Sequence, residues 1–285
     1  MNATLATLIA LALLVAAVAL VILNYQHRQI FKPQRARGKL HPDPSVHGIE
    51  FDDVSFVGAE GQQLHGWWLP CDPAAGTLLF CHGNRGNLSQ RTESCVFYRR
   101  LGLNVFAFDY RGYGHSPGKP TEAGLYADAT AAWRYLRDER GIVANEIAIL
   151  GRSLGGAVAS HLASQVRPAA VVIESTFTSI RSLARELYPR LPHWGLDRIR
   201  FDNAKRIGDI DVPLLLVHSA DDQVIGFHHG ETLASLAHPQ HRFVTISGAH
   251  SGGHLSSGDV YARPLREFLL DAGLRLLPDD VNSRR

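Results

Sequence analysis

A serine flanked by glycines stands in Gly151-Arg152-Ser153-Leu154-Gly155, after the apolar run EIAIL and before the helix-like run LGGAVASHLA. A sharp strand-to-helix turn exposes such a serine as a nucleophile, and the flanking glycines permit the turn. The backbone N–H of the next residue can then stabilise the negative oxygen formed when a carbonyl is attacked. We therefore expect Ser153 to be a nucleophile and the backbone N–H of Leu154 to be one oxyanion donor.

The same pattern occurs a second time, in Gly114-His115-Ser116-Pro117-Gly118. The residue after this serine is Pro117, which has no backbone N–H to donate. A loop, GKPTE, follows where a nucleophile turn would need the start of a helix. We expect Ser116 to be a structural residue in a turn.

A second oxyanion donor is expected from the loop that follows the run TLLF. This loop reads Cys81-His82-Gly83-Asn84-Arg85-Gly86-Asn87. Its two glycines allow the backbone to approach a substrate closely, so that N–H groups can point at a developing oxyanion. We expect the backbone N–H of Asn84 to be the donor, with Arg85 as the alternative.

A serine nucleophile needs a general base and a carboxylate that orients the base. The run PLLLV leads into HSADDQV, and the run RFVTI leads into SGAH, so both loops follow late strands of the chain. Open α/β sheets place their sites at these carboxyl ends of strands. We expect Asp222 as the acid and His250 as the base. The alternatives are Asp221 and the more distant Glu174 for the acid, and His254 for the base.

Two histidine pairs raise the question of a metal, namely His250 with His254 and His228 with His229. Neither pair has a cysteine or carboxylate at the spacing of a metal-ligand motif. The three cysteines contain no CxxC pair, which predicts neither a zinc site nor a disulfide framework. We expect no metal and no other cofactor.

Extended and helix-like segments alternate along the chain, as required to position these residues. Several extended runs are apolar throughout, which is typical of strands buried on both faces of a parallel sheet. One helix-like stretch opens at Thr121 and stops at Gly141. The alternation predicts an α/β fold with a mostly parallel, doubly wound sheet of about eight strands, the first two forming an antiparallel hairpin at one edge. The eight runs are IEFDDVSF, QLHGWWLP, TLLFCHG, NVFAFDY, EIAILG, AAVVIES, PLLLVHS and RFVTIS.

The N-terminus carries a different signal. Residues Leu5–Leu23 read LATLIALALLVAAVALVIL, and no charged side chain occurs before Arg28. As a helix this run measures roughly 28 Å, close to the ~30 Å hydrocarbon core of a bilayer. The basic residues follow the run instead of preceding it, so we expect an uncleaved transmembrane anchor over residues 1–26. Five basic side chains come next, and we term them the basic collar: Arg28, Lys32, Arg35, Arg37 and Lys39.

The basic collar predicts the membrane topology, and its positive charge offsets the negative net charge of the remaining chain. Under the positive-inside rule it holds its side of a single-pass helix in the cytoplasm, and it can bind anionic lipid headgroups. The whole chain has 29 basic and 27 acidic side chains, a formal charge of +2. Without the five charges of the basic collar, 24 basic against 27 acidic side chains leave −3. Nucleic acid is therefore not an expected partner.

Composition divides the remaining chain into a linker and one domain. Residues 27–46 are rich in proline and arginine and lack apolar periodicity, which predicts a juxtamembrane linker. Residues 47–285 show no break in composition and predict a single domain. Within that domain, residues 177–210 are long for a connection between strands and predict a small cap over the site.

The motifs together resemble those of α/β-hydrolases, in the membrane-anchored branch that includes bacterial single-pass hydrolases and eukaryotic protein depalmitoylases. The resemblance covers about residues 47–270 and rests on HGNRGN, DYRGYGHSPGKPTEAG, GRSLGGAVA, IESTFTS, FDN, HSADDQVI and GAH, in that order. It implies the α/β-hydrolase fold, with Ser153 as nucleophile, Asp222 as acid and His250 as base. The chain departs from the branch at Ser219, at Arg85 and in the SGGH that follows GAH.

These residues predict a serine hydrolase that cleaves carboxylic esters or thioesters through an acyl-enzyme on Ser153. The anchor suggests an alternative, a thioesterase that acts on acylated proteins or lipids at the membrane face. A second alternative is a catalytically idle hydrolase fold that serves as a membrane-tethered binding module. The expected partners are a small-molecule or lipid-borne acyl substrate and the membrane lipids around the N-terminal helix.

Overall fold

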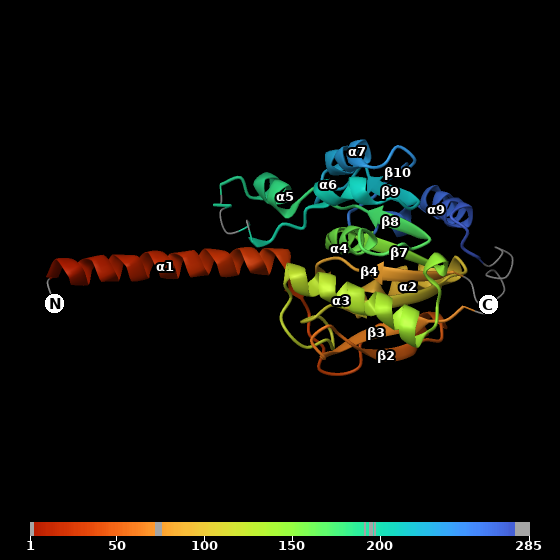
Figure 1. Cartoon of the computed structure of the whole chain (residues 1–285), viewed down its shortest axis with the longest axis horizontal. Coiled ribbons are helices and arrows are strands. Elements are labelled where there is room, and N and C mark those ends of the chain that lie inside the picture. Colours follow the sequence, from red (N-terminus) through yellow and green to blue (C-terminus); the bar gives the residue numbers. More distant parts are fainter. Residues whose placement is uncertain (1–2, 72–75, 191, 194–195, 197, 277–285) are drawn as a thin grey trace.

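Eight strands form one sheet through the body of the molecule (Figure 1). They are β2 (Asp52–Val57), β3 (Gln63–Leu69), β4 (Thr77–Cys81), β6 (Asn104–Asp109), β7 (Ile147–Arg152), β8 (Ala170–Glu174), β9 (Leu214–Ser219) and β10 (Arg242–Ile246). Their order is β10-β9-β8-β7-β4-β6-β3-β2, and β3 alone runs in the opposite direction to the other seven. The computed structural model describes residues 3–276, except 72–75, 191, 194–195 and 197.

All eight runs expected from the sequence are strands of this sheet, and the first two form the expected antiparallel hairpin at one edge. The central strands are apolar on both sides because helices cover both faces. Leu79 and Ile149 face one core, whereas the adjacent Phe80 and Leu150 face the other. This double burial accounts for the lack of polar alternation in the central runs.

Helices lie on both faces of the sheet (Figure 1). The α-helices of the described chain are α1 (Ala3–Ile30), which extends away from the sheet, α2 (Thr92–Arg100), α3 (Glu122–Arg134), α4 (Leu154–Ala163), α5 (Ile180–Leu187), α6 (Asn203–Arg206), α7 (Phe227–Leu236), α8 (Gly253–Ser256) and α9 (Asp259–Asp271). Buried residues of α3, α4 and α7 belong to one core, and those of α2 and α9 belong to the other. This arrangement confirms the doubly wound α/β fold.

The helix expected between Thr121 and Gly141 is α3, continued by a π-helical turn over Tyr135–Glu139. Thr121 caps its start, because the side-chain oxygen accepts a hydrogen bond from the backbone N–H of Gly124 at 3.0 Å. At the far end, Gly141 has φ +70°, a conformation that glycine adopts without strain.

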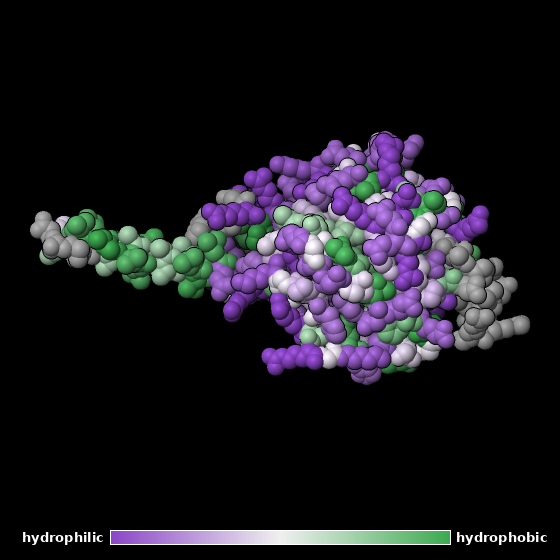
Figure 2. Space-filling view, turned by 60° about the horizontal axis from the view of Figure 1, so that its bottom comes forward, coloured by the Kyte–Doolittle hydropathy of each residue, from purple (hydrophilic) through white to green (hydrophobic). Residues whose placement is uncertain are grey.

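Helix α1 is long and apolar enough to cross a membrane. It projects from the body over most of its length, and its apolar surface contrasts with the largely polar body (Figures 1 and 2). The helix runs to Ile30, four residues beyond the expected end of the anchor. None of the residues in the most apolar stretch of this helix is buried, and most of the large apolar side chains from Leu5 to Val21 are exposed.

Residues 27–46, expected to form a linker, carry secondary structure and buried side chains. Phe31 and Leu40 are buried, and Pro44–His47 form a 3₁₀ turn. Lys32–Pro33 form the short strand β1, which pairs with β5 (Arg85–Gly86) in a separate two-stranded sheet. Single buried residues among polar ones leave no periodic pattern, so the sequence did not indicate this packing.

Candidate active site

Ser153 lies at the turn between β7 and α4, with φ 56° and ψ −123°. Few residues other than glycine adopt such a conformation, which costs of order 1–3 kcal/mol and persists only where the surroundings impose it. A Cβ on Gly155 would lie 2.0 Å from the carbonyl oxygen of Cys81, and one on Gly151 would lie 2.2 Å from the carbonyl oxygen of Gly155. Both glycines are therefore required so that α4 can approach β4 and β7 closely.

The fold brings together three of the residues expected from the sequence. The Nε2 atom of His250 lies 3.0 Å from the hydroxyl oxygen of Ser153. Its Nδ1 atom lies 2.6 Å from a carboxylate oxygen of Asp222. In this arrangement Nδ1–H donates to Asp222, so that Nε2 can accept the hydroxyl proton of Ser153.

Asp222 is held as a carboxylate by its surroundings. One of its oxygens accepts hydrogen bonds from the backbone N–H groups of Val224 and Ile225, at 2.9 and 2.8 Å. Burial alone would raise the pKa of Asp222, but the hydrogen bonds from His250 and from these two N–H groups lower the pKa below its ordinary value. A carboxylate in this state can stabilise a positive charge on His250.

The neighbouring Asp221 has a different contact. Its carboxylate accepts a hydrogen bond from the backbone N–H of Gly248 at 3.0 Å, and its side chain is exposed. This bond ties the loop after β9 to the loop after β10, which carries His250. Asp221 therefore supports the loop that presents His250, while Asp222 contacts the imidazole itself.

The other two alternatives have partners of their own. Glu174, at the end of β8, forms an ion pair with Arg152 at 2.7 Å. His254 is buried, with its Nε2 atom 3.0 Å from the hydroxyl of Ser94. Burial and the nearby cations Arg152 and Arg91 lower the pKa of His254 far below its ordinary value, so its ring is neutral. Neither side chain is a hydrogen-bond partner of the Ser153 hydroxyl among the described residues, although the backbone N–H of Ser153 donates to the carbonyl oxygen of Glu174 at 2.9 Å.

Two backbone N–H groups next to Ser153 are free to bind a developing oxyanion. Leu154 is the first residue of α4, so its N–H has no acceptor within the helix. Gly83 lies directly against Ser153, since a Cβ placed on it would be 3.4 Å from the serine Cβ. The backbone N–H of the next residue, Asn84, has no acceptor among the residues that the structure describes. The side chain of Arg85, the next residue of this loop, is exposed.

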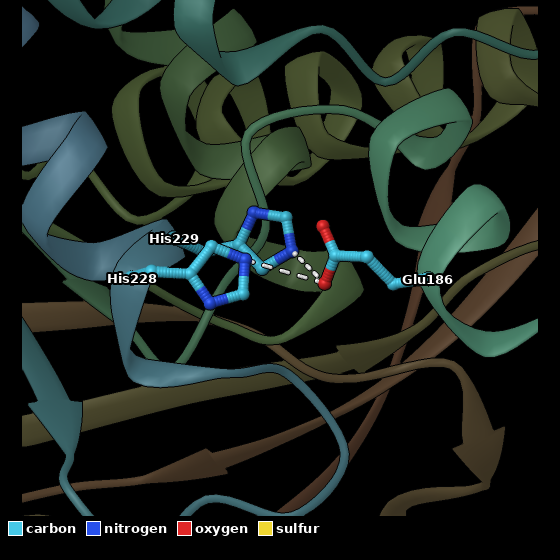
Figure 3. Close-up of side chains that lie close together, drawn as sticks. All are labelled: Glu186, His228 and His229. Carbon is cyan, nitrogen blue, oxygen red and sulfur yellow. Dashed lines mark hydrogen bonds and ion pairs between the residues drawn. The ribbon is translucent and has the colours of Figure 1, made fainter.

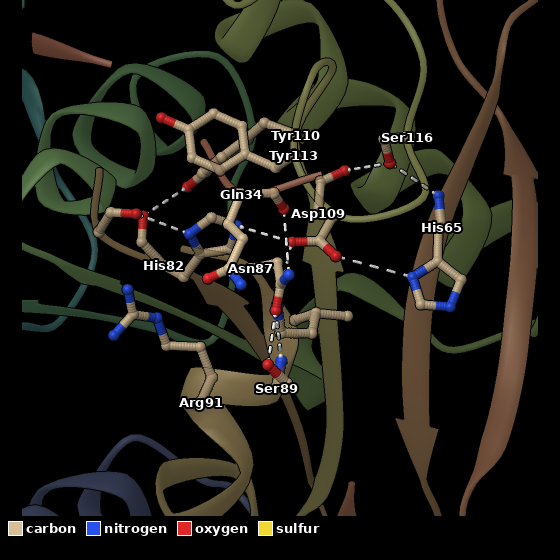
Figure 4. A network of polar contacts seen from close by, with 12 residues as sticks. Gln34, His65, His82, Asn87, Ser89, Arg91, Asp109, Tyr110, Tyr113 and Ser116 are labelled. Atoms are coloured by element: carbon tan, nitrogen blue, oxygen red, sulfur yellow. Dashed lines mark hydrogen bonds and ion pairs between the residues drawn. The ribbon is translucent and has the colours of Figure 1, made fainter. Parts of the chain in front are cut away.

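The second glycine-flanked serine is a buried residue in a turn whose His115, Pro117 and Gly118 are exposed. The hydroxyl of Ser116 donates to the carbonyl oxygen of Asp109 at 2.6 Å and accepts from the backbone N–H of His65 at 3.0 Å. Figure 4 shows Ser116 between these two partners, at the side of a polar network around the Asp109 carboxylate. Its hydroxyl has the structural role expected from the sequence.

A cavity of about 450 Å³ opens beside Ser153 and His250. Apolar side chains of α5 form one wall, and the last turns of α1 form another. The loop with Asn84 and Arg85 lies at its edge. The wall residues from these two helices are Tyr25, Gln26, Gln29, Ile30, Ile180, Leu183, Ala184 and Leu187.

The expected cap, residues 177–210, includes the cavity wall formed by α5. Residues 191, 194–195 and 197 of that segment, and residues 277–285 of the expected domain, lie outside the described part of the chain. Helix α5 is tied to α7 by Glu186, which lies 3.3 Å from His228 and 3.2 Å from His229 (Figure 3).

This group of three has the residue types of a metal site, but its hydrogen bonds favour another interpretation. The backbone N–H of Thr178 points at Nδ1 of His229 at 3.1 Å, so Nδ1 must carry a lone pair. The proton of the neutral ring is then on Nε2, where it donates to Glu186 instead of leaving a lone pair for a metal. The absence of a metal cofactor stays a prediction.

Sequence reasoning did not find the buried network beneath the nucleophile. The guanidinium of Arg152 contacts Glu174, Tyr98 and the hydroxyl of Ser94, and it lies over the ring of Phe80. Arg152 stands within the glycine-flanked motif, but its residue type predicts no partner. The position of Glu174 at the end of a strand indicated only an alternative for the catalytic acid. Nothing in the spacing of Tyr98 or Ser94 indicated that they converge on this side chain.

Comparison with known proteins places this chain in a family. The family described as Serine aminopeptidase, S33, matches residues 72–200. An uncharacterized protein of Mycobacterium tuberculosis is 35% identical over 92% of this chain and 94% of its own. Alpha/beta hydrolase domain-containing protein WAV2 of Arabidopsis thaliana is 31% identical over 90% and 91%, respectively.

Solved structures agree with this assignment at the level of the fold. An esterase of Pyrococcus furiosus superposes with a TM-score of 0.69, covering 85% of this chain and 97% of its own at 21% identity. The chain belongs to the α/β-hydrolase superfamily. Membership of this family supports a hydrolase activity.

Proposed function

We propose that the protein is a serine hydrolase that cleaves carboxylic esters or thioesters through an acyl-enzyme on Ser153. The contact chain from the Ser153 hydroxyl through His250 to Asp222 carries the proposal, with distances of 3.0 and 2.6 Å. This is the geometry of a nucleophile, its general base and an orienting carboxylate. The sequence order of serine, acid and histidine, typical of the family, supports it.

In the first half-reaction, the Ser153 oxygen attacks the carbonyl carbon while its proton passes to Nε2 of His250. The carbonyl oxygen becomes an oxyanion, which the N–H groups of Leu154 and Asn84 stabilise. The imidazolium, stabilised by Asp222, then gives its proton to the leaving alkoxide or thiolate as the C–O or C–S bond breaks. An acyl ester on Ser153 and a free alcohol or thiol result.

In the second half-reaction, water replaces the leaving group. His250 takes a proton from water, and the hydroxide attacks the acyl carbon. The oxyanion again forms between Leu154 and Asn84, and the proton then returns to the Ser153 oxygen as the acyl bond breaks. A carboxylic acid is released and the free serine is restored.

The cavity beside Ser153 favours an apolar acyl group. Ile180, Leu183 and Leu187 form a continuous apolar wall on α5, and buried apolar surface contributes roughly 25 cal/mol per Å² to binding. The cavity also borders the end of α1, which we propose to be a single-pass anchor with the body on the cytoplasmic side. Lipid headgroups would then contact the basic collar. This arrangement supports a second candidate function, which is the hydrolysis of acyl groups carried by membrane lipids or acylated proteins.

Hydrolysis of p-nitrophenyl esters of increasing chain length tests the proposal, with acyl thioesters of the same lengths alongside. The full-length protein in detergent is expected to turn over both series, with kcat/KM rising toward medium or long chains. A sharp optimum at acetate would contradict the lipid-borne candidate while leaving the esterase in place. Absence of turnover by a folded protein would favour the idle binding module instead.

A further inference from the structure

The segment that follows the anchor lies against the loop expected to bind the oxyanion. The backbone N–H of Lys32 donates to the carbonyl oxygen of Asn84 at 3.0 Å, and that of Gln34 donates to Gly86 at 2.9 Å. These bonds join β1 to β5 in parallel register. Strand β5 has two residues and lies outside the main sheet, and among the described residues β1 is its strand partner.

Two side chains of the oxyanion loop also form hydrogen bonds to the N-terminal segment. The amide of Asn84 donates to the carbonyl oxygen of Ile30 at 3.0 Å, and the amide of Asn87 donates to that of Gln34 at 3.0 Å. Figure 4 shows Gln34 and Asn87 next to the Asp109 carboxylate, joined by this hydrogen bond. The carbonyl oxygen of Asn84 also accepts a hydrogen bond from the hydroxyl of Tyr113 at 2.9 Å. Asn84 thus has three partners, and two of them belong to the N-terminal segment.

The body of the domain holds the other side of the loop. Asp109, at the end of β6, is fully buried and accepts the backbone N–H of Leu88 at 3.1 Å. Its other carboxylate oxygen leaves no room for a side chain at position 114, where a Cβ would lie 1.9 Å away. Gly114 in turn links this part of the domain to the N-terminal segment, because its backbone N–H donates to the carbonyl oxygen of Gln34 at 3.0 Å.

The N-terminal segment is itself fixed in place by the end of α1. The side chain of Gln26 donates to the carbonyl oxygen of Pro192 at 2.6 Å, and His27 lies 2.9 Å from that of Pro120. Phe31 is buried, with its ring 6.0 Å from the ring of Phe201. The position of β1 is therefore set by the domain as well as by the helix.

We propose that the segment from Ile30 to Gln34 is a positioning element of the active site, which holds the oxyanion loop in register through the backbone bonds of β1 to β5. The inference rests on the proposed hydrolase function. A two-residue strand has too few bonds to fix itself, and an oxyanion donor must be placed to within a fraction of an ångström. The anchor helix and the catalytic centre then form one unit, and residues before position 47 belong to the enzyme as much as to its membrane attachment.

Proline substitutions in the full-length protein test this proposal, because they remove one backbone N–H each. Lys32→Pro removes the bond to Asn84, and Gln34→Pro removes the bond to Gly86. Arg37→Pro is the matched control, since the N–H of this exposed residue has no acceptor among the described residues. The readouts are kcat and KM on a short soluble ester, with a thermal melt of each variant.

We expect Lys32→Pro to lower kcat roughly 10–100-fold with KM within about threefold of wild type. The reason is that the oxyanion is absent from the bound substrate and forms only on the way to the tetrahedral intermediate. Gln34→Pro should have a smaller effect of the same kind, and Arg37→Pro should have none. Folded Lys32→Pro and Gln34→Pro variants with wild-type kcat would overturn the proposal. A wild-type protein without Ser153-dependent turnover would instead overturn the proposed function.

Hydrogen exchange on the wild-type protein decides the matter if neither proline variant folds. The amides of Lys32 and Gln34 should then exchange as slowly as those of β4. Rapid exchange at these two amides, with β4 protected, would show that β1 does not hold the loop and would contradict the proposal.

Discussion

The chain contains the same five-residue pattern twice, and the two copies do different things. Around Ser153 the pattern joins a strand to a helix and places the hydroxyl at the edge of a cavity, within 3.0 Å of a histidine. Around Ser116 it makes a turn in which the serine side chain is buried and its hydroxyl has two backbone partners. The difference lies in the residue after the serine, because Leu154 can open a helix and donate an N–H, whereas Pro117 cannot donate.

Other pairs of similar residues show the same division. Asp222 contacts the imidazole of His250, while its neighbour Asp221 ties two loops together. His250 lies next to Ser153, while His254, four residues later, is buried against Ser94. In each pair, residue type indicates chemistry, but the partner within hydrogen-bond distance decides between a reactive and a structural role.

Replacing the two serines separates the motifs most strongly. Ser153→Ala should lower kcat on a p-nitrophenyl ester by about 10⁴–10⁶-fold, because it removes the attacking atom. Ser116→Ala should leave kcat within about threefold and should cost about 1–3 kcal/mol of unfolding free energy, because its two partners lose a buried hydroxyl. Ester hydrolysis and urea unfolding of both variants measure this. Equal loss of activity in both would break the comparison.

The aspartates should differ by a somewhat smaller factor. Asp222→Asn should lower kcat by about 10³–10⁴-fold, because an amide cannot hold the imidazole in the required tautomer or stabilise its positive charge. Asp221→Asn keeps an oxygen that can accept the N–H of Gly248, so kcat should stay within about fivefold. If Asp221→Asn were inactive and Asp222→Asn active, the assignment of the acid would be wrong.

Alanine substitutions of one glycine in each motif should differ in their cost in unfolding free energy. Gly155→Ala should cost about 4 kcal/mol or more, since its Cβ would lie 2.0 Å from a backbone oxygen of β4 that cannot move aside. Gly118→Ala meets only an ordinary contact, 3.5 Å from Arg111, but must adopt φ +96°. Its cost should be about 1–3 kcal/mol. Urea unfolding at neutral pH measures both, and a milder effect at Gly155 than at Gly118 would contradict the packing described.

The histidines predict a smaller effect that depends on pH. Since the folded state lowers the pKa of His254, the unfolded state binds a proton first as the pH falls below the ordinary value of about 6.5. Wild-type stability should therefore fall by up to about 1.4 kcal/mol per pH unit from this group below pH 6.5. His254→Asn should remove that part of the slope. An unchanged slope between pH 6.5 and 5 would contradict a neutral, buried ring.

Sequence patterns were sufficient to predict the strands of the sheet, because the central strands are apolar on both faces and the turns between them carry glycine or proline. The residues of the candidate site were also predictable, since each follows a strand and so lies at one edge of a parallel sheet. The partners of Arg152 were not predictable, because Ser94 and Tyr98 come from helix α2, more than 50 residues earlier in the chain. The pairing of Lys32 with Asn84 left no signal either, since backbone bonds between short segments do not depend on a residue pattern.

The central claim is that Ser153, and not Ser116, is the reactive serine of this chain. A fluorophosphonate probe tests it directly, because an activated serine oxygen displaces fluoride and stays bonded to phosphorus. Full-length protein is labelled in detergent and digested, and the modified peptide is located by mass spectrometry. We predict one adduct, on Ser153, that is lost in Ser153→Ala and in heat-denatured protein. A folded protein without an adduct, or with its adduct on Ser116, would contradict the account.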